Sequence, residues 1–225
     1  MLGASGSGAS SRVTDVSTVL RALTLSALLT LVPVGIGVAL TDDSTPTREA
    51  APYEGTDLVD FDTSAAVVQR APFCDLLPDE AVTEALGADA EPTTYANGEE
   101  SEVLPGGDVS HEYGCVFSAG EESAGDARAW VFAPPVTTAR AEELVEATPA
   151  KGCRPAGSAP AFGTPSVALV CASGDLRTAS FRGLFGDAWL SCSLTLPAGA
   201  AGDDLLTRAG RWCVAVAEAS SVPSE

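Results

Sequence analysis

The sequence has few basic residues and almost no histidine. Of 225 residues, 12 are Lys or Arg against 31 Asp or Glu, which gives a formal net charge of −19. A chain so acidic repels phosphate backbones, and no basic patch offsets the repulsion, so we exclude nucleic acid as a partner. Motifs of the G-x-S-x-G, S-x-x-K and H-E-x-x-H types and phosphate-binding loops are also missing, which removes the common signatures of hydrolases and nucleotide-binding enzymes.

The single histidine is the only candidate imidazole base. His111 lies next to Glu112 and three residues after Asp108, a spacing that would suit a His-carboxylate pair or a weak metal site. We favour the alternative that it is a surface residue in a turn-rich loop.

Acidic side chains gather in two short stretches that are candidates for Ca²⁺ binding. These are Asp57, Asp60 and Asp62, and Glu99, Glu100 and Glu102. Neither stretch has the EF-hand spacing with its central glycine, so we interpret both as solvated charge. We therefore expect no catalytic residue, no cofactor and no metal ligand.

One long apolar run, residues 22–40, contains no charged side chain. At about 1.5 Å per residue it reaches about 29 Å, the thickness of the hydrocarbon core of a bilayer. Arginines precede the run and aspartates follow it. The positive-inside rule then predicts a short cytoplasmic tail at 1–18, a transmembrane helix at 19–40, and everything beyond it outside the cytoplasm.

A cleaved signal peptide is the alternative to this retained anchor. Gly37-Val38-Ala39 offers a small-x-small site, and cleavage after Ala39 would release the rest as a secreted protein. No cysteine lies between the apolar run and Phe73, so we exclude a lipoprotein.

All six cysteines follow the apolar run. An even number outside the cytoplasm predicts disulfides, whereas the absence of C-x-x-C and the single histidine argue against zinc. Six cysteines allow 15 pairings. Our preferred set is Cys74–Cys115, Cys153–Cys171 and Cys192–Cys213.

Local patterns support the last of these pairs. Residues 189–196 alternate as a half-buried strand with Cys192 on the apolar face. Residues 203–219 have apolar positions at helical spacing with Cys213 among them. A strand and the helix that follows it would thus meet through this bridge.

The chain divides into an acidic beginning and a nearly neutral remainder. Residues 41–126 carry 21 acidic and two basic side chains, whereas 127–225 carry nine and eight. We interpret 41–71 as a flexible acidic tether, 72–219 as the disulfide-stabilised domain and 220–225 as a disordered tail.

Within the domain the patterns predict α+β structure, with antiparallel strands and helices on one face. A helix follows Cys74 and stops at Gly87, and Thr138 caps another. Strand, turn, strand, proline and helix then occur twice, which raises the idea of an internal duplication. The expected strands are 114–118, 128–133, 167–172, 176–182 and 188–196.

The stretch Phe73-Cys74-Asp75-Leu76-Leu77-Pro78-Asp79-Glu80, which leads to Gly114-Cys115-Val116-Phe117, resembles the opening of small actinobacterial cell-envelope domains of unknown function. Many of those domains are lipoproteins, and this chain departs from them because it has no lipid-attachment cysteine. The resemblance covers 73–117. It implies a cell-surface location and a Cys74–Cys115 bridge, and it supplies no catalytic residues.

From these features we expect a non-enzymatic, membrane-anchored, extracytoplasmic binding module of the bacterial cell envelope, whose partner is an envelope protein or wall component. Two alternatives stay open. One is an extracytoplasmic hydrolase that uses Asp or Glu carboxylates, which need no short motif. The other is a secreted domain that binds a small ligand or Ca²⁺.

Overall fold

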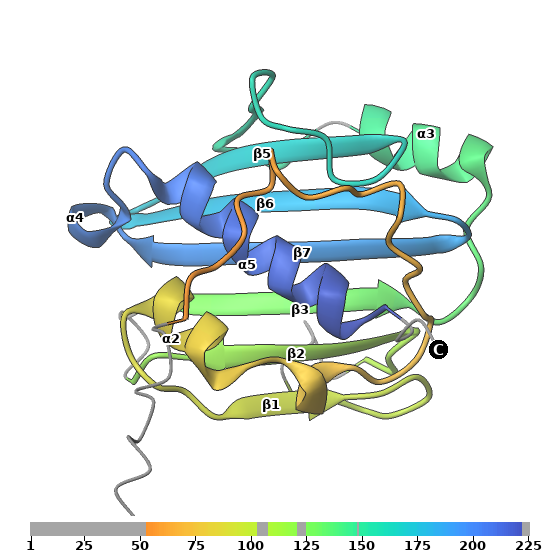
Figure 1. The fold of residues 1–225 in the computed structure, drawn as a ribbon, viewed down its shortest axis with the longest axis horizontal. Helices are drawn as coiled ribbons and strands as arrows, with labels where there is room; N and C mark the ends of the chain where they lie inside the picture. The colour runs from red at the N-terminus through yellow and green to blue at the C-terminus, as the bar shows by residue number, and fades with distance from the viewer. Residues whose placement is uncertain (1–52, 103–107, 121–124, 148, 222–225) are drawn as a thin grey trace, which may run out of the picture. The chain divides into compact units, whose positions relative to one another are not determined.

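A computed structural model describes residues 53–102, 108–120, 125–147 and 149–221. They form a seven-stranded antiparallel sheet with helices, as the predicted α+β class requires (Figure 1). The sheet order is β1-β2-β3-β7-β6-β5-β4. The strands are β1 (Pro92–Tyr95), β2 (Glu112–Ser118), β3 (Asp126–Phe132), β4 (Cys153–Pro155), β5 (Ser166–Ser173), β6 (Leu176–Phe185) and β7 (Ala188–Pro197). The helices are η1 (Cys74–Leu76), α2 (Asp79–Leu86), α3 (Thr138–Glu146), α4 (Ala198–Ala201) and α5 (Leu205–Ala219).

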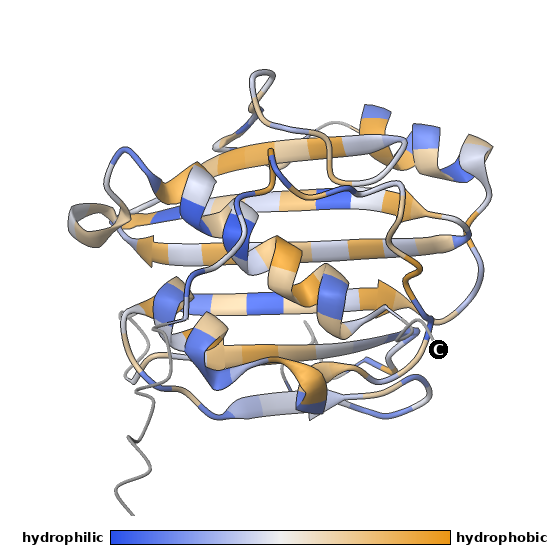
Figure 2. Cartoon of the chain, in the orientation of Figure 1, coloured by the Kyte–Doolittle hydropathy of each residue, from blue (hydrophilic) through white to orange (hydrophobic). Residues whose placement is uncertain are grey.

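The main core lies between the sheet and α5, with α2 beside it. Apolar and polar residues alternate along parts of the strands (Figure 2). This pattern arises because successive residues of a strand point to opposite faces of the sheet. Leu190, Cys192 and Leu194 of β7 are buried in the core with Trp212 and Cys213 of α5. The central strands therefore carry the apolar stripe that α5 covers.

Helix α3 does not share that face, which corrects the prediction of helices on one face. Its Ala141 belongs to a second buried cluster with Trp189 of β7 and Leu184 of β6. Trp189 precedes Leu190 in the strand, so the two side chains point to opposite sides of the sheet. An amphipathic pattern shows that a helix has a buried face, but it does not say which side of a sheet that face will cover.

The idea of a duplication is supported only by the strands. β1-β2-β3 and β5-β6-β7 are both meanders, and β3 pairs with β7 where they meet. If a two-fold axis perpendicular to the sheet between β3 and β7 related the two halves, α3, which follows β3, and α5, which follows β7, would cover the same face of the sheet. Because α3 and α5 cover opposite faces, the placement of the helices is not repeated.

The sequence predicts a flexible tether over 41–71, but residues 53–71 are packed against the folded domain, where they run across it before α2 (Figure 1). We call this segment the strap. Leu58 and Val68 of the strap are buried, at 5% and 6% exposure. Val68 also forms an antiparallel bridge with Ser221, and Ser220 is buried. The body therefore begins earlier than 72 and extends past 219.

The predicted cytoplasmic tail, transmembrane helix, cleavage site and first part of the tether, residues 1–52, lie outside the described residues, as do 222–225. Within the described ranges, no helix is long and apolar enough to cross a membrane.

Three disulfides join the pairs that the sequence favoured: Cys74–Cys115, Cys153–Cys171 and Cys192–Cys213. The first ties η1 to β2, the second joins the register partners of β4 and β5, and the third fastens α5 to β7. Disulfides persist in oxidising compartments, so they indicate an extracytoplasmic location for the folded domain.

Candidate functional site

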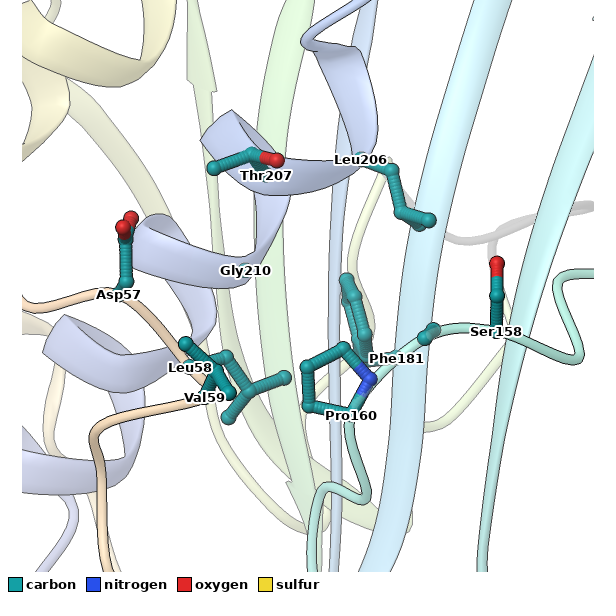
Figure 3. Close-up of a pocket in the computed structure, with 10 residues that line it drawn as sticks. Asp57, Leu58, Val59, Ser158, Pro160, Phe181, Leu206, Thr207 and Gly210 are labelled. Atoms are coloured by element: carbon teal, nitrogen blue, oxygen red, sulfur yellow. The ribbon is translucent and has the colours of Figure 1, made fainter.

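Two adjoining cavities lie on the α5 side of the sheet, and together we call them the groove. The first has a volume of about 250 Å³ and lies where the strap, the 158–160 loop, β6 and α5 meet (Figure 3). We call it the apolar pocket. Leu58 and Val59 of the strap extend toward Pro160, while Phe181 lies beneath them and Leu206 belongs to α5.

The second cavity, which we call the arginine pocket, has a volume of about 470 Å³. Arg154 of β4 and Arg177 of β6 line it, together with Asp203 from the turn between α4 and α5. Ser158 and Leu206 line both cavities. The groove therefore has an apolar end and a cationic end.

Strand register explains why the two arginines share a cavity. Arg154 pairs with Val170, which in turn pairs with Ala179, and Arg177 lies two residues before Ala179. Residues two apart in a strand point to the same face, so both arginines project on the α5 side. Strand spacing and rise place their Cα atoms roughly 12 Å apart, within the reach of two long side chains toward one ligand.

Neither arginine forms an ion pair with a described residue: no described carboxylate oxygen lies within 4.0 Å of the guanidinium nitrogens of Arg154 or Arg177. Arg177 is oriented by its own loop, since Nη1 donates to the carbonyl oxygens of Gly174 at 3.0 Å and Leu176 at 2.8 Å. Four other described arginines do pair with carboxylates, namely Arg70, Arg128, Arg140 and Arg211.

The strap wall of the groove is fixed by Arg211 of α5. This guanidinium bonds to Glu84 of α2 through Nε and to Asp57 of the strap through Nη1, the latter at 3.1 Å. Leu58 packs against Gly210, where an added Cβ would come within 3.3 Å of the leucine Cβ. The small residue in α5 lets the strap lie close to the helix.

We expect Arg211→Gln to loosen the strap and to lower the free energy of unfolding by about 1 kcal/mol, because it removes both ion pairs from a partly exposed cluster. Amide hydrogen exchange of 57–61 should accelerate, and urea unfolding gives the stability. Arg140→Gln is the matched control, since its pair with Glu143 is 61% and 66% exposed. Equal exchange rates in the strap of both variants would contradict this role for Arg211.

Three of the acidic side chains singled out in the sequence, Asp57, Asp62 and Glu99, have partners within the protein. Asp57 pairs with Arg211, while Asp62 accepts hydrogen bonds from the amide of Ser64 at 3.0 Å and from its hydroxyl at 2.6 Å. Glu99 accepts from the amide of Ala96 at 3.0 Å. Among the described residues no group of three or more potential ligands is placed to hold a metal ion.

His111 is exposed, as the surface interpretation predicted, and the notable neighbour is Glu112. The hydroxyl of Tyr95 donates to Oε1 of Glu112 at 2.8 Å. Burial raises the pKa of Glu112, an effect opposed by this hydrogen bond and by His111. Burial and the adjacent Glu112 carboxylate raise the pKa of Tyr95.

The carboxyl group with the raised pKa does not lie in the groove. Glu112 is in β2 and Tyr95 is in β1, so both lie near the edge of the sheet that is opposite the edge formed by β4. A carboxylate-based hydrolase needs a second carboxyl group opposite such an acid across a substrate cleft. The described lining of the groove brings Asp57 to one pocket and Asp203 to the other, with neither beside Glu112.

The raised pKa of Glu112 makes the folded state bind this proton more tightly than the unfolded chain does. Stability from this group is therefore present at low pH and lost as the pH rises through the raised pKa. We expect Glu112→Gln, which still accepts from Tyr95, to be more stable than the wild type at pH 8, by about 0.5 kcal/mol. At pH 4 the advantage should vanish. Urea unfolding at the two pH values measures it, and a variant less stable at pH 8 would show that the hydrogen bond outweighs burial.

Most of the aromatic residues pack in the interior, as predicted. Trp189, Trp212, Phe181 and Phe185 are at most 4% exposed. Trp130 and Phe132 are half-buried against the α3 cluster, with ring centroids 4.9 Å apart. Phe181 is the one that also reaches the groove, as part of the apolar pocket.

The comparisons with known proteins return no match: no family model, curated protein or solved structure is similar to the chain.

Proposed function

We propose that the chain is a non-enzymatic binding module of the bacterial cell envelope, and that the groove beside α5 is its ligand site. The observation that carries the proposal is the joining of an apolar pocket to a pocket with two arginines that lack described carboxylate partners. Ligand sites are commonly concave and apolar, with a few polar groups that fix orientation. The groove has this composition.

The rim of the groove adds support. Val59 is 72% exposed at the mouth of the apolar pocket. A single exposed valine is ordinary on a protein surface. Here it continues the apolar surface of Leu58 and Pro160 outward, which favours contact with a ligand (Figure 3).

The location in the envelope is supported by the three disulfides, by the uncharged run at 22–40 and by the resemblance of 73–117 to actinobacterial envelope domains. In this proposal 19–40 anchors the domain in the cell membrane, and the ligand is a wall or membrane component or a group on an envelope protein. The first described segment after this anchor in the sequence is the strap, which forms one wall of the groove.

The test uses the full chain in zwitterionic nanodiscs, mixed with fractions of an envelope extract. A ligand that binds only the folded state raises the unfolding temperature by mass action, by about 3 °C or more at ten times its Kd. Thr207→Trp places a bulky side chain in the groove from an exposed position on α5. Thr138→Trp, the same exchange at an exposed position on α3, is the control.

We expect one fraction to stabilise the wild type and Thr138→Trp but not Thr207→Trp. Equal stabilisation of all three proteins would place the ligand elsewhere. If no fraction stabilises any of them, the proposal fails. Turnover of a generic ester or glycoside that Thr207→Trp abolishes would replace binding with catalysis.

A further inference from the structure

We propose that the groove binds a small amphiphilic anion, with a carboxylate or phosphate head group between Arg154 and Arg177 and a short apolar chain in the apolar pocket. This inference rests on the proposed function and specifies its ligand. Three features of the groove support it: the two arginines of the arginine pocket, the apolar side chains of the apolar pocket, and the residues that line both pockets.

The arginine pocket has a positive charge without a described counterion. Acidic residues outnumber basic ones 31 to 12 in this chain, yet Arg154 and Arg177 have no carboxylate within salt-bridge distance among the described residues. A guanidinium has five N–H donors in a planar fork that matches the oxygens of a carboxylate or phosphate. Two guanidinium groups that line one cavity are therefore complementary to a carboxylate or phosphate head group.

Asp203 sets the net charge of this end of the groove. It is the one acidic side chain in the described lining of the arginine pocket, against the two guanidinium groups. Two guanidinium groups and one carboxylate give the pocket a net charge of +1 when all three are ionised. An anionic head group fits this balance, whereas a cationic head group would face two like charges.

The adjoining pocket accounts for the rest of the ligand. Apolar side chains from the strap, the 158–160 loop, β6 and α5 line it, together with the polar side chains of Asp57, Ser158 and Thr207. Its volume of about 250 Å³ equals about eight groups of the size of a water molecule. Because Leu206 and Ser158 line both pockets, a chain that starts at the arginines enters the apolar pocket without crossing the protein. A head group with an eight-carbon chain is thus the appropriate probe.

The experiment is calorimetric titration of the full chain in zwitterionic nanodiscs, with protein-free nanodiscs as the blank. Octanoate and octyl phosphate are the anionic probes, and octanol and octyltrimethylammonium share their chain but not their charge. We expect each neutral or cationic probe to bind at least tenfold more weakly than the better anion. The tighter of the two anions identifies whether the head group is a carboxylate or a phosphate.

Variants assign the two ends of the ligand. Arg154→Gln/Arg177→Gln should weaken the better anion at least tenfold, whereas Arg128→Gln/Arg140→Gln, which removes two arginines outside the groove, should not. Val59→Ser should weaken octanoate about threefold. Val67→Ser, a matched change at a strap residue that is 60% exposed and not in the lining of either pocket, should leave it unchanged.

The inference is overturned if octanol binds as tightly as the anions, or if the Arg154/Arg177 double variant binds them like the wild type. If neither anion binds while an extract fraction still stabilises the wild type and not Thr207→Trp, the ligand has another chemistry and the proposed function stands. If no extract fraction acts either, both fail together. Thermal unfolding of each variant without ligand confirms that it is folded.

Discussion

Trp212→Ala should lower the free energy of unfolding by about 4 kcal/mol, a large share of the total for a domain of this size. The side chain is 1% exposed and lies at the centre of the main core. Its ring meets Phe117 edge to face with centroids 5.7 Å apart, and its indole N–H donates to the carbonyl oxygen of Arg128 at 3.2 Å. Truncation leaves a cavity between α5 and strands β2 and β3.

Two further variants separate the causes of this loss. Trp212→Phe keeps an aromatic ring but removes the N–H donor, and we expect it to lose about 1–2 kcal/mol. Trp130→Ala is the matched control, since Trp130 is only half-buried on the opposite face. Urea unfolding followed by circular dichroism gives the free energies. A loss for Trp130→Ala as large as that for Trp212→Ala would mean that the α3 face contributes as much stability as the α5 face.

The central strands and helices were predictable because their patterns are strong and local. The sequence of β7 alternates over residues 189–196, and α2 has an explicit stop at Gly87, whose φ of +76° favours glycine. The cap of α3 was misplaced by one residue, because Thr137 rather than Thr138 accepts the amide hydrogen of Arg140. Neighbouring threonines give nearly the same local signal.

The edge strands were missed because nothing in their own sequence requires them. β1 is four residues long with three of them exposed, and β4 has three residues, two of them exposed. Both exist through pairing with a neighbour, β2 in one case and β5 in the other. The strap was missed for a related reason, since its apolar residues occur in short stretches such as 58–59 and 65–68, which show no helical or strand period.

The groove could not be located from the sequence because its parts come from distant segments. Asp57, Arg154 and Leu206 meet only after the sheet, the strap and α5 have assembled. One signal was present: Arg177 shares the face of Ala179 and Phe181 in a predicted strand, so a charged residue lay on an apolar face. Such a residue is placed either at the edge of a core or in a site, and here it lines the arginine pocket.

Removing the Cys74–Cys115 bridge should cost about as much as Trp212→Ala. The two cysteines are 41 residues apart, and in the chain-entropy model a loop of that length contributes about 4 kcal/mol. Both are buried, Cys115 completely, so Cys74→Ala/Cys115→Ala also removes packed sulfur atoms from the core. The bridge holds η1 against β2, and loss of it frees the start of α2, which carries the Glu84 partner of Arg211.

The Cys153–Cys171 bridge provides the comparison. Its loop spans 18 residues, which the same model values at about 3 kcal/mol, and both cysteines are partly exposed near the edge of the sheet. We therefore expect Cys153→Ala/Cys171→Ala to be the milder change in urea unfolding without reductant. Under native conditions dithiothreitol should also open this bridge first, as alkylation and mass spectrometry would detect. The prediction is contradicted if Cys74–Cys115 is reduced first or if its removal costs less than the removal of Cys153–Cys171. Burial and loop length would then not determine the contribution of these bridges, and the region around η1 would be the part of the domain that opens most readily.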